Sequence, residues 1–323
     1  MTHWSIDDWE PSFGAAFDAA APEGPAAPSS AHVETDVELP ASAWRPLTAP
    51  PHVRAPDVVL LVDGVRRNDA LLWSHEEDGT SYPGLAASYA AGVVRCDLRR
   101  GVAEVARTRV ERGFFTASPS ATDLVTSQAA YPLHRVPGAT ELNALQAAVQ
   151  PRLSALEVAV SDETRVDGDV LVVDGPLRTR RHLPRALGYN KTHHRQYLSP
   201  ELTSVVTALA PGTRSPIFQL STPGGWTWWS WYLRLPGASR APWAGIARVE
   251  CSTECSRQEA IELADMSLVT LPRFASPPYK DPRAPQNLMP IAGLERRLRG
   301  LLGDATLLRR SLALAAQGAP VHR

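Results

Sequence analysis

The sequence has few of the residues that mark secreted, zinc-binding or membrane-spanning proteins. Three cysteines in 323 residues are too few for a disulfide framework. Cys251 and Cys255 form a C-x3-C pair, but no second Cys or His pair stands at the spacing of a structural zinc site. No run approaches the roughly 20 apolar residues of a membrane span. The acidic N-terminus lacks the charged start and apolar run of a signal peptide. These absences predict a cytoplasmic protein with no membrane partner.

The sequence also lacks an excess of positive charge and any phosphate-binding G-x-x-x-x-G-K-[ST] loop. Its formal net charge is −1, so a nucleic-acid contact would need a local basic patch. Only Lys191 and Lys280 are lysines among the 33 cationic residues. A GC-rich genome explains this arginine bias, which also suits the 29 prolines. Without the loop, any ATP hydrolysis must come from a partner.

What is present is ordinary for a globular chain, with 44% hydrophobic and 21% charged residues. Residues 1–50 are rich in Ala, Pro and Ser, and we expect them to be largely flexible. Trp4, Trp9 and Phe13 within them are either docking residues or aromatics that pack on the protein itself. Residues 51–323 are predicted to form a single domain.

Apolar periodicity predicts strands followed by helices, as in an α/β or α+β domain. The expected strands are residues 57–64, 70–73, 84–95, 101–107, 169–175, 217–220, 227–235 and 245–250, with a hairpin turn at Asp78-Gly79. The expected helices are residues 139–160, 200–210, 257–266, 291–302 and 306–316. Pro151 should kink or split the first of these helices.

Two of the expected strands end in the same way, at Asp63-Gly64 and at Asp174-Gly175. An Asp at the end of a buried strand lies where ligands bind at the edge of a sheet. Two such carboxylates on adjacent strands repel each other unless a cation lies between them. Oxygen ligands favour Mg²⁺ or Mn²⁺. Alternatively, each Asp simply opens a tight turn.

A third carboxylate, Glu157, is expected on the helix that precedes Asp174. It shares a helical stripe with Leu153 and Val160, so its side chain should turn toward the protein. An acidic group on an inward face is costly unless it is paired or binds a metal. The alternative is a solvated residue at the rim.

In this order along the chain, the motifs resemble the NurA nuclease family. They are Val62-Asp63-Gly64, the helix with Glu157, Val173-Asp174-Gly175-Pro176-Leu177, Gly188-Tyr189-Asn190-Lys191, and the segment from Asp281 through Asn287 and Ile291 to Leu294-Glu295 and Asp304. Trp9-Glu10-Pro11-Ser12-Phe13-Gly14 resembles the start of its bacterial members.

The resemblance implies an RNase H-like mixed sheet flanked by helices, with additional strands and C-terminal helices. It also implies a Mn²⁺- or Mg²⁺-dependent DNA exonuclease or endonuclease, a homodimer, and a HerA-type hexameric ATPase as partner in DNA end processing, repair or defence. Asp63, Glu157 and Asp174 match the family's metal ligands, and Lys191 matches a lysine near the site. Where many archaeal relatives carry a histidine, this chain has none, and Asp281 is the expected fourth ligand.

In a two-metal mechanism, Asp63 and Asp174 would hold ions on either side of the scissile phosphate. Glu157 would complete one ion's ligands or orient the water, and Lys191 would neutralise the phosphate. The residues expected to contact DNA are Arg66, Arg178, Arg180, Arg181, Arg185 and Arg234. The four of these arginines that come soon after Asp174 in the sequence, from Arg178 to Arg185, could instead lie in a solvated, charged loop.

Two further motifs have structural alternatives. His193-His194 could bind metal, but a phosphate or structural role suits adjacent histidines better. Four tryptophans in the strand over 227–235 and directly before it could stack bases, although alternating aromatics on a strand more often belong to a core or an interface: Trp226, Trp228, Trp229 and Trp231.

The competing hypothesis for the whole protein is a catalytically weak or inactive RNase H-like subunit that binds DNA or scaffolds a translocase. An Argonaute-like nuclease half is a third reading, but 323 residues leave no room for a guide-binding domain.

Overall fold

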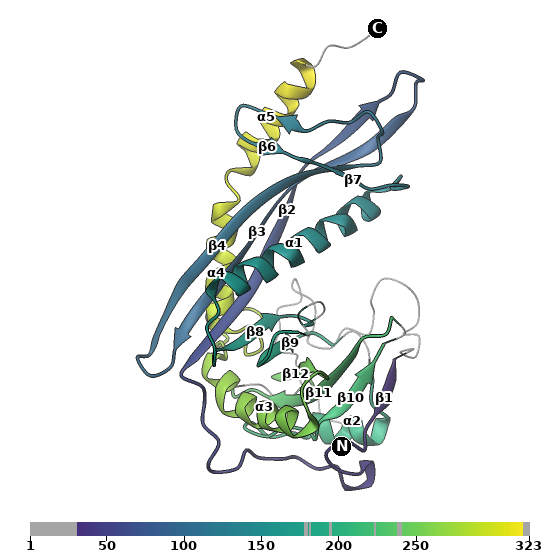
Figure 1. Cartoon of the computed structure of the whole chain (residues 1–323). Helices are drawn as coiled ribbons and strands as arrows, with labels where there is room; N and C mark the ends of the chain where they lie inside the picture. Colours follow the sequence, from purple (N-terminus) through teal and green to yellow (C-terminus); the bar gives the residue numbers. More distant parts are fainter. Residues whose placement is uncertain are drawn as a thin grey trace, which may run out of the picture. The chain divides into compact units, whose positions relative to one another are not determined.

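The structure is a computed structural model that describes residues 31–177, 180, 182–193, 196–222, 224–237 and 241–318. It has a mixed α/β architecture with a large mixed sheet flanked by helices, as the sequence predicts (Figure 1). The chain divides into two compact units. Unit 1 comprises Met1–Leu61, Arg95–Glu104 and Arg165–Ala292, and unit 2 comprises Val62–Val94, Val105–Thr164 and Gly293–Arg323.

Unit 1 is built on one mixed set of strands. Their order is β1 (His32–Glu34), β10 (Phe218–Ser221), β11 (Thr227–Arg234), β12 (Ile246–Ser252), β9 (Ala186–Asn190), β8 (Val170–Asp174) and the start of β2 (Val58–His75). β8 pairs in parallel with β9, whereas the pairs from β9 through to β1 are antiparallel. The residues of β8 from Val170 to Val173 are all buried, which fits a strand covered on both faces.

Helices and loops complete the core of unit 1. They are η2 (Ala41–Ala43), α2 (Pro200–Thr207), α3 (Arg257–Thr270) and η4 (Leu271–Phe274). Val206 of α2 packs with Phe218 and Tyr232 of the sheet and with Trp44 from the segment before β2. Residues 31–50 therefore include ordered structure, although the whole segment 1–50 is predicted from composition to be largely flexible. Trp4, Trp9 and Phe13 lie outside the described residues.

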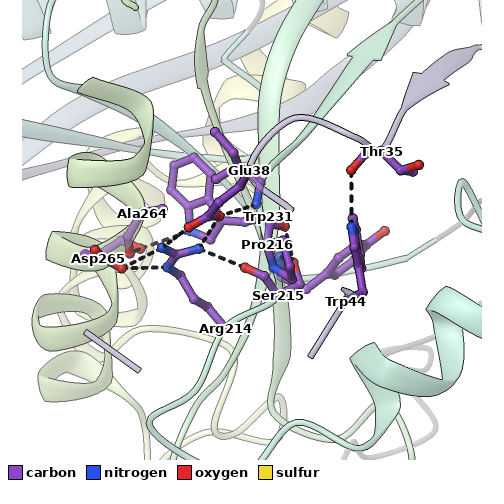
Figure 2. Close-up of polar contacts among 12 residues, drawn as sticks. Thr35, Glu38, Trp44, Arg214, Ser215, Pro216, Trp231, Ala264 and Asp265 are labelled. Carbon is purple, nitrogen blue, oxygen red and sulfur yellow. Dashed lines mark hydrogen bonds and ion pairs between the residues drawn. The ribbon is translucent and has the colours of Figure 1, made fainter. Parts of the chain in front are cut away.

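A buried ionic cluster links three segments of unit 1 (Figure 2). The guanidinium of Arg214 donates to both carboxylate oxygens of Glu38, at 2.8 and 2.9 Å. It also donates to Asp265 of α3 at 2.8 Å and to the carbonyl of Ser215 at 3.0 Å. Burial opposes the charge of Arg214, but the hydrogen bonds and ion pairs with both carboxylates raise its pKa above the usual value. Glu38 also accepts the backbone N–H of Ile217 at 2.8 Å.

Unit 2 contains the long strands β2, β3 (Ser81–Asp97) and β4 (Val102–Thr116), followed in the strand order by β7 (Leu133–Arg135). β5 (Leu124–Val125) and β6 (Ala130–Tyr131) form a separate pair. The boundary between the units falls inside β2, between Leu61 and Val62. The helices are α1 (Leu142–Thr164), the greater part of α4 (Met289–Leu301) and α5 (Ala305–Gly318) (Figure 1).

The helices of unit 2 contact its strands through apolar side chains. Leu153 of α1 lies over Gly64 of β2, and Leu294 and Leu298 of α4 lie over Gly92 of β3. Leu312 of α5 belongs to a buried cluster with Phe114 and Tyr131. The glycines let the helices approach the strands closely, since a Cβ at Gly64 or Gly92 would stand between 2.6 and 3.2 Å from these leucines.

The structure corrects one detail of the sequence-based reading, the strand end at Asp63, and excludes one of the two outcomes expected at Pro151, a split helix. Asp63-Gly64 does not end a strand, because Gly64 keeps an extended backbone and β2 runs on to His75. The turn comes at Asp78-Gly79, as predicted, where Gly79 has φ of 86°. Pro151 does not split α1, which runs for 23 residues. Its ring is exposed, while buried residues continue on the other side of the helix before and after it.

Across the described residues, no helix is long and apolar enough to span a membrane.

Candidate metal and phosphate site

Asp174 is the last residue of β8, and the backbone turns sharply after it. Gly175 has φ of 106°, a conformation that favours glycine, and its N–H donates to the carbonyl of Tyr189 at 2.8 Å. The turn leaves the Asp174 side chain 10% exposed beside Lys191, whose Nζ lies 2.6 Å from Asp174 Oδ2. The predicted Asp-Gly strand end is thus confirmed at Asp174, and the structure brings Asp174 and Lys191 together.

A chain of polar contacts holds the Lys191 ammonium. Lys191 Nζ also donates to Asn287 Oδ1 at 3.0 Å. The amide nitrogen of Asn287 donates in turn to Asp281 Oδ2 at 2.6 Å. The other oxygen of Asp281 accepts the backbone N–H of Arg283 at 2.8 Å. Asp281 is buried with both oxygens in hydrogen bonds and orients Asn287, and its role as a fourth metal ligand stays a prediction.

The neighbouring residues of β9 fix the same edge of the sheet. The hydroxyl of Tyr189 donates to the carbonyl of Gln286 at 2.7 Å. Burial, with the nearby Asp174 charge, raises the pKa of Tyr189 well above its usual value, so this hydroxyl stays a donor. The side chain of Gln286 reaches β12 through Gly245 N–H and the Ile246 carbonyl, at 3.2 and 3.1 Å. These contacts join the segment of Asp281 and Asn287 to the sheet.

A pocket of about 530 Å³ opens beside Asp174 and Lys191. Asn190, at the end of β9, also lines it, and the Asn190 amide nitrogen is buried with no hydrogen-bond partner among the described residues. Arg248 lies over the ring of Tyr197, 5.4 Å from its centroid, and both line the pocket. The pocket therefore combines cationic groups with a buried donor, which are features of a site for an anion.

Glu250 of β12 holds the backbone segment that follows Asp174. Its Oε1 accepts the N–H of Leu177 at 2.8 Å, and its Oε2 accepts from Arg248 at 2.6 Å. Gly188 of β9 lies between these groups. A Cβ there would stand 2.8 Å from both the Leu177 nitrogen and the Cγ of Glu250.

Gly188→Ala is therefore expected to lower the free energy of unfolding by about 1–3 kcal/mol, because one of the two contacts is with backbone that cannot rotate away. Urea denaturation measures the change. Gly293→Ala in α4 is the matched control, since a Cβ there meets nothing within 4 Å, and it should be neutral or stabilise by about 0.5–1 kcal/mol. Equal stabilities for the Gly188→Ala variant and the wild type would contradict the packing described.

In unit 2, two acidic side chains lie close together, one on β2 and one on α4, and a third faces β2 from α1. Asp63 is buried, and a carboxylate oxygen of Asp63 lies within 4.8 Å of one from Glu295 of α4. Glu157 of α1 is half-buried, and its Oε1 lies against Gly64, 2.6 Å from the place of a Cβ. Glu157 therefore faces β2 on the side of Gly64, which is opposite to the side of the Asp63 side chain, because successive residues of a strand point to opposite faces. Two close carboxylates such as Asp63 and Glu295 repel each other unless a cation joins them.

Glu295 was not among the residues that we predicted as ligands. A signal was present in the sequence, because Glu295 lies one turn after Ile291 and next to Leu294, both of which are buried on α4. Its side chain is only 13% exposed. An acidic residue at the edge of an apolar helical stripe is the same signal that identified Glu157.

The arginines proposed for DNA contact have different surroundings. Arg234 is buried and donates to the carbonyls of Thr207, Pro242 and Ala244, each at 2.8 Å, which gives it a structural use. Arg180 is 1% exposed. Arg66 and Arg185 are exposed, and Arg66 donates to the Gln146 carbonyl at 3.2 Å. Arg178 and Arg181 lie outside the described residues.

Most of the described residues of the His193-His194 and tryptophan motifs are packed in the interior of unit 1. His193 is buried, with Nε2 3.0 Å from the Ile246 carbonyl and its ring near Trp243. His194 lies outside the described residues. Trp228 and Trp231 are buried, which agrees with the core alternative. Trp226 is 38% exposed and stacks on Trp228.

No protein-family model matches this chain, and no curated protein matches it in sequence.

Proposed function

We propose that the protein is a metal-dependent DNA nuclease with an RNase H-like core that hydrolyses phosphodiester bonds. The observation that carries the proposal is the carboxylate pair of Asp63 and Glu295 in unit 2, which offers two oxygens within 4.8 Å of each other to a metal ion. Asp174, in unit 1, enters the proposal through the motif resemblance.

The donor set fits the proposed ion. Asp63 and Glu295 are both carboxylates, and hard cations such as Mg²⁺ and Mn²⁺ prefer oxygen ligands. Glu157 faces Gly64, on the other side of β2 from the Asp63 side chain, so its role as a ligand rests on the motif resemblance alone. A bound cation would polarise a phosphoryl oxygen and acidify a bound water.

The chain's own residues would hold the phosphate. Lys191 has three N–H donors, of which Asp174 and Asn287 take two. We propose that the third donor binds a phosphate oxygen of DNA, and that the amide nitrogen of Asn190 donates to another. Asn287, held by Asp281, positions the ammonium but does not touch the substrate. Arg66 and Arg185 remain candidates for contacts with the DNA backbone.

The partners that we propose are DNA, a second copy of the chain and a HerA-type hexameric ATPase. They follow from the motif resemblance. They also agree with the lack of a phosphate-binding loop for ATP, since strand translocation would then need a separate motor. End processing in DNA repair or in defence against foreign DNA is the role that we propose.

One observation favours the second candidate, an inactive subunit that binds DNA or scaffolds the motor. Lys191 already gives Asp174 a cationic partner at 2.6 Å, so Asp174 does not need a metal ion to balance its charge.

Titration of the protein with Mn²⁺ in a calorimeter separates the two candidates. The wild type should bind Mn²⁺, and Glu295→Gln should weaken binding at least about tenfold, because even the outer contacts of a metal site are worth that much. Glu77→Gln, at an exposed position, is the matched control and should bind like the wild type. A wild-type protein that binds no Mn²⁺ would favour the scaffold instead.

A further inference from the structure

Cys251 and Cys255 meet at one end of the unit 1 sheet, outside the proposed nuclease site. Cys251 lies in β12, where it is buried, and Cys255 follows in the turn before α3, where it is half-buried. Their Sγ atoms are 3.9 Å apart. No disulfide joins them in the structure, so both are thiols in direct contact.

The backbone around the pair is held in place on both sides. Cys251 pairs with Trp229 across β11 and β12, and the indole N–H of Trp229 donates to the carbonyl of Cys255 at 3.1 Å. The Thr253 hydroxyl donates to the carbonyl of Thr227 at 3.2 Å. Ser256 begins α3 with a capping box. A disulfide needs the two sulfurs to close from 3.9 Å by about 1.9 Å, to the bond length of about 2.05 Å.

The two thiols have unequal character. The two sulfurs are within hydrogen-bond distance, and this contact with Cys251 lowers the pKa of Cys255. The same contact and burial raise the pKa of Cys251 well above its usual value. Cys255 is also the more exposed of the two. Cys255 is thus suited to react first with a small oxidant, and Cys251 to react second.

We propose that Cys251 and Cys255 form a reversible disulfide, a redox modification site that does not depend on the proposed nuclease activity. The Cys255 thiolate attacks one oxygen of a hydroperoxide, here hydrogen peroxide. The O–O bond breaks, and Cys255 becomes a sulfenic acid as one water leaves after protonation. The Cys251 sulfur then attacks the Cys255 sulfur, the S–O bond breaks and a second water leaves. Two thiols are oxidised by two electrons, peroxide is reduced to two waters, and a dithiol reverses the bond by exchange.

A metal site does not explain the pair. Within the described part of the chain, the group of three or more His, Cys, Asp and Glu side chains that could hold an ion contains neither cysteine. The proximity of the two sulfurs therefore favours oxidation over zinc binding.

The experiment treats the full chain with one to two equivalents of hydrogen peroxide and then with dithiothreitol. Trypsin cleaves after Arg248 and Arg257, so one peptide, residues 249–257, carries both cysteines. Its mass should fall by about 2 Da on oxidation, two of the three thiols should be lost under denaturing conditions, and dithiothreitol should restore both.

Three variants test which cysteines are oxidised and which of them reacts first. Cys96→Ser should oxidise like the wild type, because Cys96 is buried and its burial raises its pKa to about 11. Cys255→Ser should resist peroxide, and Cys251→Ser should gain oxygen at Cys255 instead of losing about 2 Da. Retention of all three thiols by the wild type, or gain of oxygen on residues 249–257 without loss of hydrogen, would overturn the proposal.

Discussion

Replacing Arg214 with methionine is expected to lower the free energy of unfolding by about 3–5 kcal/mol, because it leaves two carboxylates without their cation. The Arg214 side chain is 2% exposed, and those of Glu38 and Asp265 are 12% and 9% exposed. Water therefore cannot replace the lost guanidinium at either acid. Glu38 comes from the segment before η2 and Asp265 from α3, so the variant loosens both from the sheet (Figure 2).

Chemical denaturation followed by tryptophan fluorescence measures this effect. Arg100→Met is the matched control, because Arg100 is exposed, and surface substitutions usually change stability by less than about 0.5 kcal/mol. Adding Glu38→Gln to the Arg214→Met variant should recover part of the loss, since one uncompensated charge is removed. A loss below about 1 kcal/mol for Arg214→Met would contradict the role given to this cluster.

Asp63→Asn is expected to reduce metal-dependent DNA cleavage by more than about a hundredfold. The substitution keeps the size of the side chain and removes one negative charge from the carboxylate pair that Asp63 forms with Glu295. Loss of an outer contact to a metal ligand already costs 10–100-fold, so loss of a ligand charge should cost at least as much. Initial rates on end-labelled linear DNA with Mn²⁺ give the comparison.

Asp162→Asn is the control for Asp63→Asn, since Asp162 is exposed on α1 in the same unit. It should cleave like the wild type. Circular dichroism should show that both variants are folded. A folded Asp63→Asn protein with wild-type rates would remove Asp63 from the proposed site.

The sequence was sufficient to predict most elements, because their periodicity is strong. The strand ending at Asp174 and the helix carrying Glu157 lie where their apolar patterns indicate. The reading failed at Asp63-Gly64, because Asp-Gly can stand either in a turn or in an extended strand. The local sequence does not report that a helix packs on Gly64.

Long-range contacts account for what the sequence could not predict at the site. The link from Asp281 through Asn287 to Lys191 joins residues about a hundred positions apart, and nothing in local patterning shows it. Arg234 had the same sequence signal as an exposed cation, yet its guanidinium binds three carbonyls in the interior. The positive charge of an arginine alone does not show whether its side chain is exposed or buried.

The most direct test of the proposed nuclease is degradation of end-labelled single- and double-stranded DNA with Mn²⁺, Mg²⁺ or EDTA, comparing the wild type with Asp174→Ala. Asp167→Asn, at an exposed position in the loop before β8, serves as the control. We expect cleavage by the wild type and the control with either metal, and none with EDTA or in Asp174→Ala. Undegraded DNA with the wild type, both alone and with a HerA-type ATPase added, or equal cleavage by Asp174→Ala, would contradict the nuclease assignment.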